Sequence, residues 1–286
     1  MSHSPHDTPP GSAQAAQAAQ AEQTEQTTQT ARLALACLDL TSLNDSDDAA
    51  AITALCARAS HGKAGAPAAV CVWPRFVAQA RAALPAGMRV AAVANFPAGG
   101  LDVAAAVADA RAIVAAGGDE VDLVLPWRAL LAGDGGDGGD PAGAAAVVAA
   151  VRAACPGRTL KLIIESGDLA TPALILQACL IGLDAGVDFL KTSTGKTATG
   201  ATPEAARVML QAIAGHPRGA AVGFKASGGI RTVADGAVYI ALVRQILGEA
   251  ALTPRRLRFG ASGLLGDIEA VLAGQGTGNT AAPGSY

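Results

Sequence analysis

Residues 160–192 read LKLIIESGDLATPALILQACLIGLDAGVDFLKT, and this stretch decides the fold. Two short apolar runs, Leu160 to Glu165 and Val187 to Thr192, flank an Ala-containing stretch with the composition of a helix. Strands joined through a helix run parallel, and a parallel sheet is covered on both faces, so its strands are nearly continuous apolar runs. The stretch therefore predicts a strand, a crossover helix and a second, parallel strand.

The same alternation extends in both directions along the chain. The apolar runs are Leu35 to Leu40, Ala68 to Trp73, Val90 to Asn95, Glu120 to Leu125, Leu160 to Glu165, Val187 to Thr192, Ala221 to Lys225 and Leu257 to Ala261. Eight such units in 286 residues predict a single-domain (β/α)8 TIM barrel. An open, doubly wound sheet is the competing architecture, but the first strand-to-helix turn, Asp39 to Asp45, carries no GxGxxG motif.

Segments of low complexity flank the predicted barrel domain, which we place at residues 31–273. Residues 1–30 consist of Ala, Gln and Thr repeats after a Pro-rich start, and we expect them to form a disordered tail. Ala and Gln also tolerate helix, so a helix over Ala13 to Leu35 is the alternative. Residues 274–286 are rich in Gly, Thr and Ala, and we expect a flexible C-terminal tail there.

Composition excludes several classes of partner. Twenty-one basic and 24 acidic residues give a formal net charge of -3, without the basic stripe of a nucleic-acid-binding protein. The N-terminus lacks the features of a signal peptide, and no uninterrupted apolar run reaches the roughly 18 residues of a membrane span. Five cysteines without metal-binding spacing are consistent with reduced core thiols. We therefore expect a cytoplasmic protein without nucleic-acid or membrane partners.

Charged residues occur in the predicted strands, mostly near their C-terminal ends. They are Asp39, Asp122, Glu165, Lys191 and Lys225. Barrel enzymes carry their active sites on the rim formed by these strand ends. The alternative is a set of buried ion pairs that ties the barrel together, but such pairs often add no net stability. We favour an active site.

Two of these residues are suited to Schiff-base chemistry. A lysine is nucleophilic only as the neutral amine, and both desolvation and a neighbouring ammonium favour that form. Lys191 and Lys225, on the predicted sixth and seventh strands, supply such a pair. Charge considerations alone do not decide which of the two is the nucleophile.

Three loops that follow the last strands have the composition of a phosphate site. They are Ser193 to Lys196, Ser227 to Gly229 and Gly260 to Gly263. Such loops expose backbone N–H groups and hydroxyls, and barrel phosphate sites commonly follow strands seven and eight. For any single Gly-Gly pair, an ordinary tight turn is the alternative.

Several motifs, taken together and in order, resemble the deoxyribose-phosphate aldolase family from about Leu35 to Gly266. They are LDLTSLN (38–44), CVWPRF (71–76), NFP (95–97), DEVDLVLP (119–126), FLKTSTGK (189–196), GFKASGGIR (223–231) and RFGAS (258–262). The resemblance implies a metal-free and cofactor-free class I aldolase. It would split 2-deoxy-D-ribose 5-phosphate into acetaldehyde and D-glyceraldehyde 3-phosphate, and a homodimer is a family-level expectation.

The resemblance also implies roles for individual residues. Lys191 would form the Schiff base, Lys225 would be the second lysine, Asp122 would relay protons, and Asp39 would support that network. A terminal tyrosine, Tyr286, would assist proton transfer at C2, with a solvated chain end as the alternative. The expected phosphate-binding residues are Thr194, Gly195, Lys196, Gly228, Gly229 and Ser262.

Three positions depart from the usual family pattern, and three other functions remain open. Ala226 and Ser227 stand where Pro-Ala commonly follows the second lysine, and Gly263 stands where a second serine is frequent. The alternatives are another Schiff-base aldolase on a barrel, a phosphosugar isomerase with Glu165 as base, and a non-catalytic phosphosugar-binding barrel. Cys71 matches a cysteine near the family's site, although we favour a packed thiol.

Overall fold

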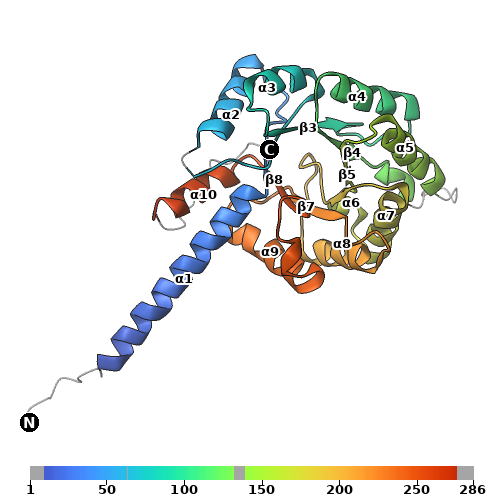
Figure 1. Cartoon of the computed structure of the whole chain (residues 1–286). Coiled ribbons are helices and arrows are strands. Elements are labelled where there is room, and N and C mark those ends of the chain that lie inside the picture. The colour runs from blue at the N-terminus through green and yellow to red at the C-terminus, as the bar shows by residue number, and fades with distance from the viewer. Residues whose placement is uncertain (1–9, 63, 132–138, 276–286) are drawn as a thin grey trace, which may run out of the picture.

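The computed structural model describes residues 10–62, 64–131 and 139–275, and shows eight parallel strands closed into a barrel in chain order (Figure 1). The first strand pairs with the last, so no sheet edge is left open. This arrangement confirms the predicted (β/α)8 barrel. Within the described ranges, none of the helices has the length and apolar character needed to cross a membrane.

The strands coincide with the predicted apolar runs to within a few residues. Their bounds are β1 Leu38–Thr41, β2 Ala69–Val72, β3 Arg89–Ala94, β4 Glu120–Val124, β5 Thr159–Ile163, β6 Phe189–Lys191, β7 Gly223–Ser227 and β8 Leu257–Ala261. The largest difference is at the first run, where Leu35 belongs to the preceding helix instead of the strand.

Helices surround the barrel and connect its strands. Their bounds are α1 Pro10–Ala36, α2 Ala49–His61, α3 Val77–Ala83, α4 Val103–Ala115, α5 Pro141–Ala154, α6 Ser166–Leu169, α7 Pro172–Ala185, α8 Pro203–Gly215, α9 Val233–Leu247 and α10 Leu264–Leu272. Three short 3-10 turns complete the set: η1 Pro74–Phe76, η2 Trp127–Leu130 and η3 Glu249–Ala251. Asp or Thr side chains cap the first turns of α2, α4, α5, α7, α8 and α9, which fixes where these helices begin.

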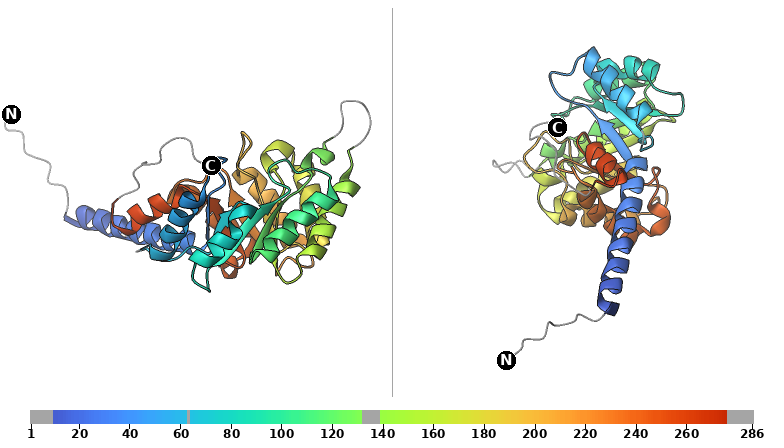
Figure 2. Two further views of the ribbon diagram at one scale, coloured as in Figure 1. Left: turned by 90° about the horizontal axis from the view of Figure 1, so that it is seen from above. Right: turned by 90° about the vertical axis from the view of Figure 1, so that its left-hand side faces the viewer.

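The N-terminal helix α1 projects from the barrel for most of its length (Figures 1 and 2). Only its last turns are buried, at Ala31, Ala34 and Leu35, where α1 packs against α10 and α9. Residues 10–36 form a helix, as in the second of the two expectations for this stretch, and are not disordered as in the first. Ala and Gln favour helix, and packing against the barrel anchors the C-terminal end of α1. Residues 1–9 lie outside the described ranges.

The barrel interior combines a charged region with a small apolar one. Lys191 and Lys225 are partners in the pairing of β6 with β7, as predicted for neighbouring strands. Asp122 and Lys161 are partners in the pairing of β4 with β5. A separate apolar cluster of Leu43, Cys71, Ala91 and Val93 adjoins β1, β2 and β3, whereas the main apolar core includes the packing between strands and helices.

Candidate active site

Seven charged side chains from six strands form one connected network inside the barrel, which we call the ion-pair cluster. Its members are Asp39 of β1, Glu120 and Asp122 of β4, Lys161 of β5, Lys191 of β6, Lys225 of β7 and Arg258 of β8. None of them is more than 3% exposed. The structure therefore brings together four predicted residues, Asp39, Asp122, Lys191 and Lys225, and adds three.

Lys161, one of the three additional residues, pairs with three carboxylates. Its Nζ lies 2.6 Å from Glu120 Oε2, 2.6 Å from Asp122 Oδ1 and 3.4 Å from Asp39 Oδ2. In the predicted run Leu160 to Glu165 this lysine is the second residue, away from the strand end, whereas in β5 it is level with Asp122 of β4. Its charge within an otherwise apolar run was the available signal.

Arg258 and Glu120 form the other end of the cluster. The guanidinium of Arg258 donates to Glu120 Oε1 at 2.9 Å and also to Asp39 Oδ1. Glu120 precedes Asp122 by two residues on β4, so both side chains point to the same face of the strand. That spacing was a second signal in the sequence.

Lys191 and Lys225 differ in how many carboxylates hold them. The Nζ of Lys225 lies 2.5 Å from Asp39 Oδ2 and 2.8 Å from Asp122 Oδ2. The Nζ of Lys191 lies 2.9 Å from Asp122 Oδ2, and no second carboxylate of the described chain is within 4.0 Å of it. Losing the proton of Lys191 therefore breaks one ion pair, whereas losing that of Lys225 breaks two.

The permanent charges of the cluster follow from the balance between burial and neighbouring charge. Burial acts to raise the pKa of Asp122, but the three lysines outweigh burial and hold that pKa well below its ordinary value. The pKa of Asp39 is lowered for the same kind of reason, with neighbouring cations overcoming burial. Burial acts to lower the pKa of Lys161, and its carboxylate partners outweigh burial and raise it. Both carboxylates are thus ionised and Lys161 is protonated at neutral pH.

A cavity of about 650 Å³ opens at the C-terminal rim beside the cluster. Its volume is that of a typical small-molecule site. The wall between cavity and cluster includes Gly260, where an added Cβ would lie 3.0 Å from Lys225 Cε. A side chain at position 260 would press on Lys225, so glycine at this position lets the side chain of Lys225 lie close to the backbone of β8.

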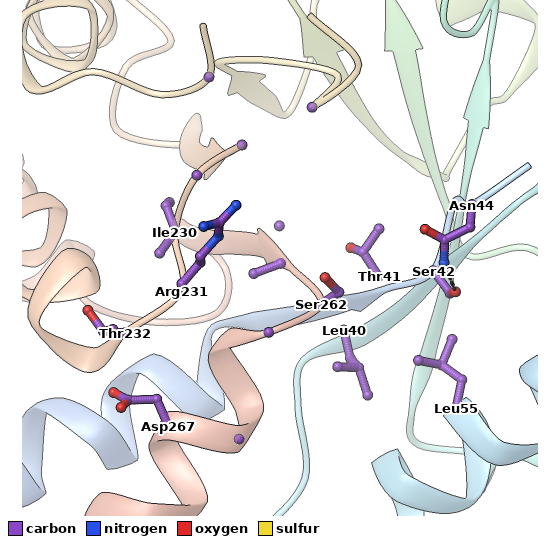
Figure 3. A pocket seen from close by; sticks show the side chains of 18 of the residues that line it. Leu40, Thr41, Ser42, Asn44, Leu55, Ile230, Arg231, Thr232, Ser262 and Asp267 are labelled. Atoms are coloured by element: carbon purple, nitrogen blue, oxygen red, sulfur yellow. Dashed lines mark hydrogen bonds between the residues drawn. The ribbon is translucent and has the colours of Figure 1, made fainter. Parts of the chain in front are cut away.

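The cavity lining combines the predicted phosphate loops with parts of other elements. Gly195, Gly228, Gly229 and Ser262 line it as expected. Figure 3 shows Thr41, from β1, and Ser262, after β8, facing the same space, with Arg231 on the loop after β7. The lining also includes residues that the sequence analysis did not select: Thr41, Ser42, Asn44 and Arg231.

Two of the expected phosphate-binding residues are absent from the lining among the described residues. Thr194 is fully buried, its hydroxyl donates to Glu165, and it accepts the backbone N–H of Lys196. Lys196 Nζ lies 3.7 Å from Asp45 Oδ1. Ser227 is also directed away from the cavity, because its hydroxyl donates to the carbonyl of Ser193 at 2.6 Å.

Glu165 does not have the geometry of a free general base. Its Oε1 accepts the backbone N–H of Thr194 at 3.1 Å, and its Oε2 accepts the Thr194 hydroxyl at 2.6 Å. Burial raises the pKa of Glu165, while the hydrogen bonds from Thr194 act in the opposite direction. Both oxygens are engaged by the neighbouring loop, which disfavours the isomerase alternative.

Two further expectations concern Cys71 and Tyr286. Cys71 is fully buried in the apolar cluster beside the charged network, and burial raises the pKa of its thiol, which is consistent with a packed thiol. Tyr286 lies outside the described residues, together with 276–285 of the predicted tail.

Comparisons with known proteins agree on one family. Residues 33–263 match the family described as DeoC/LacD family aldolase. A deoxyribose-phosphate aldolase of Agrobacterium fabrum is 48% identical over 223 residues, which cover 77% of this chain and 83% of that protein.

Solved structures share the fold. A candidate deoxyribose-phosphate aldolase from Coccidioides immitis has a TM-score of 0.70 at 27% identity, covering 83% of this chain and 86% of that one. Another from Toxoplasma gondii ME49 has a TM-score of 0.78 at 24% identity, covering 88% and 97%. At that identity, the second likeness concerns the fold alone.

Proposed function

Since the chain belongs to the DeoC/LacD aldolase family, we propose that it reversibly cleaves 2-deoxy-D-ribose 5-phosphate through a Schiff base on Lys191. The products are acetaldehyde and D-glyceraldehyde 3-phosphate. The observation that carries the choice of lysine is the ion-pair cluster, in which Lys191 alone among the three lysines has a single carboxylate partner. It is the lysine that becomes neutral with the smallest loss of electrostatic energy.

The other two lysines have supporting roles in this proposal. Lys225 and Lys161 each pair with at least two carboxylates, and two such cations beside Lys191 make a further positive charge on Lys191 unfavourable. Arg258 completes the cationic side of the cluster, and Arg89 at the start of β3 also lies 3.6 Å from Glu120.

The reaction begins with attack of the neutral Lys191 amine on the C1 aldehyde, followed by loss of water to give a protonated imine. Asp122, hydrogen-bonded to Lys191 Nζ, takes the proton of the C3 hydroxyl through a water molecule. The C2–C3 bond then breaks and its electron pair moves toward the imine nitrogen. D-Glyceraldehyde 3-phosphate leaves, and an enamine remains on Lys191.

The second half of the reaction restores the lysine. A proton adds to C2 of the enamine, and water hydrolyses the resulting imine to acetaldehyde and free Lys191. We propose Tyr286 as the group that assists the C2 proton transfer. A tail of about thirteen residues extends to some 40 Å, which is long enough to reach the rim from the end of α10.

The rim loops supply the phosphate site of the proposal. Gly195, Gly228 and Gly229 have positive φ angles of 79°, 84° and 85° and line the cavity, so their turns present backbone to it without side chains. Ser262 adds a hydroxyl, and we propose Lys196 as the nearby ammonium. A non-catalytic phosphosugar-binding barrel would need this cavity, but it would not need the adjoining lysines.

Borohydride trapping tests the proposal. Acetaldehyde and sodium borohydride should add a reduced two-carbon group to Lys191, identified by a peptide map. Lys161→Met and Lys225→Met are matched variants that keep Lys191 and should still be labelled there, whereas Lys191→Met should remain unlabelled and inactive. Labelling only at Lys161 or Lys225, or full cleavage by Lys191→Met, would reject the assignment.

The proposal extends to assembly and location. Leu176 and Leu180 of α7 are 42% and 41% exposed and line an apolar groove between α5 and α7, which supports a homodimer through this face. Light scattering of the wild type and of Leu180→Glu tests this part. All five cysteines are free and buried, which supports a location in the reducing cytoplasm.

A further inference from the structure

Glu165 is a fully buried carboxylate that takes no part in the chemistry proposed above. It follows β5 directly and has φ 53° and ψ 56°, the left-handed conformation, which is uncommon for a residue other than glycine. Residues held in such conformations occur often at functional sites, where the surrounding structure compensates for the strain. Here the conformation accompanies a carboxylate bonded to the loop after β6.

The carboxylate of Glu165 contacts residues on both sides of the turn formed by Gly195 and Lys196. On one side it accepts the N–H and the hydroxyl of Thr194, at 3.1 Å and 2.6 Å. On the other side it accepts the hydroxyl of Thr197, at 3.4 Å. The turn between these contacts includes Gly195, which lines the cavity with a φ of 79°.

The hydrogen bonds around Thr194 have a fixed direction. The Thr194 hydroxyl donates its single proton to Glu165 Oε2, at 2.6 Å. Its oxygen is then free to accept the backbone N–H of Lys196, at 3.0 Å. Glu165 therefore determines how Thr194 holds the residue on the far side of Gly195.

Residues 165–167 connect β5 to the first turn of α6, and we call them the corner. Ser166 and Gly167 of the corner contact the loop after β6, as Glu165 does. The N–H of Ser166 donates to the carbonyl of Thr192 at 2.9 Å, near the start of the loop. At Gly167, an added Cβ would lie 2.3 Å from the carbonyl oxygen of Thr199, so the corner also packs closely against the far end. The corner thus supports the loop along its length.

We propose that Glu165 is a positioning residue that sets the preference for phosphorylated over unphosphorylated substrate, by holding the Gly195–Lys196 turn in its phosphate-binding shape. The inference rests on the proposed function, because it assumes that this turn contacts the substrate phosphate. Glu165 acts through Thr194 and Thr197 and does not touch the reacting atoms. Its loss should therefore weaken phosphate binding while leaving the lysine chemistry intact.

The test compares the cleavage of 2-deoxy-D-ribose 5-phosphate with that of 2-deoxy-D-ribose. Glu165→Gln keeps the size of the side chain but removes its charge and one acceptor. It should raise KM for the phosphorylated substrate about tenfold or more, as expected for a lost charge-assisted hydrogen bond. Its kcat/KM for 2-deoxy-D-ribose should stay within about twofold of wild type, because Lys191 is unaffected.

Matched variants separate this role from a general effect on folding. Asp168→Asn removes an exposed carboxylate next to the corner and should leave the ratio of the two kcat/KM values unchanged. Thr194→Val should lower that ratio as Glu165→Gln does, and Thr194→Ser, which keeps the hydroxyl, should restore it. The comparison of Thr194→Val with Thr194→Ser tests the positioning role even if Glu165→Gln does not fold.

The outcomes for this inference and for the proposed function are distinct. Trapping with acetaldehyde and borohydride involves no phosphate, so failure to label wild-type Lys191 would reject the proposed function alone. If wild type is labelled and cleaves the phosphorylated sugar, an unchanged substrate ratio in Thr194→Val or in folded Glu165→Gln would overturn the positioning role. An equal loss with both substrates would also overturn it.

Discussion

Replacing Lys161 by methionine should destabilise the barrel and shift its activity to higher pH. The substitution removes a buried cation that lies 2.6 Å from each of two carboxylates and 3.4 Å from a third. Removing one member of a buried ion pair typically costs about 3–5 kcal/mol, because the partner stays buried without compensation. Total stabilities are about 5–15 kcal/mol, so this loss is a large fraction.

The same substitution should alter the chemistry. Without Lys161, Asp122 keeps only Lys191 and Lys225 as cationic partners, and protonated Lys191 becomes more favourable. The acid limb of the kcat/KM profile should move up by about one pH unit, equivalent to about 1.4 kcal/mol. Removal of Glu120 as well, in Lys161→Met/Glu120→Gln, should recover part of the stability because it removes an unpaired carboxylate.

Urea unfolding followed by circular dichroism and pH-dependent initial rates measure the two effects. Arg244→Met is the matched control, because it removes a cation from an exposed ion pair with Glu249 and should cost less than about 1 kcal/mol. If Lys161→Met unfolds at the urea concentration of the control and keeps the wild-type acid limb, the charge argument for Lys191 is wrong.

Four further predictions concern the cluster, the tail and the reaction. Lys225→Leu should move the acid limb of kcat/KM to higher pH, and an unmoved limb in rate measurements would exclude its electrostatic role. Deleting Tyr286 should lower kcat on the order of 10²-fold and slow deuterium exchange into acetaldehyde, measured by NMR, while borohydride labelling of Lys191 persists. EDTA should leave initial rates unchanged, since the imine supplies the electron sink; a loss restored by a divalent ion would contradict this. The pKa values of Asp39 and Asp122 are lowered in the folded protein, so their ionised forms contribute full stability above the unfolded pKa of about 4. The urea midpoint should therefore fall as the pH drops below about 4, and it should fall less steeply in Asp122→Asn.

The sequence was sufficient to predict the barrel and the proximity of four charged residues, whose catalytic roles stay predictions. Lys191 and Lys225 follow apolar runs on consecutive strands, so a closed parallel barrel brings them together, and the pairing of β6 with β7 confirms this. Lys161 was missed because strand ends alone were searched for charge. The pairing of β4 with β5 places it level with Asp122, and its partners come from the other strands β1 and β4.

Side-chain direction within loops was harder to predict than strand position. Thr194 belongs to the motif that includes Gly195, yet it is buried and bonded to Glu165 whereas Gly195 lines the cavity. The Ser227 hydroxyl similarly donates a hydrogen bond to the carbonyl of Ser193, in the loop after β6. Loop dihedral angles and long-range hydrogen bonds decide these directions, and a motif in one sequence contains neither.

The projecting helix α1 has a practical consequence for attaching the protein to surfaces or to fusion partners. The chain enters β1 from the barrel end opposite the cavity, and residues 14–26 of the helix are exposed. Seventeen residues, 10–26, correspond to a rod of about 25 Å at the rise of an α-helix. Linkage near the start of α1, which projects from the barrel in Figure 2, therefore provides a built-in spacer between the barrel and the attached partner.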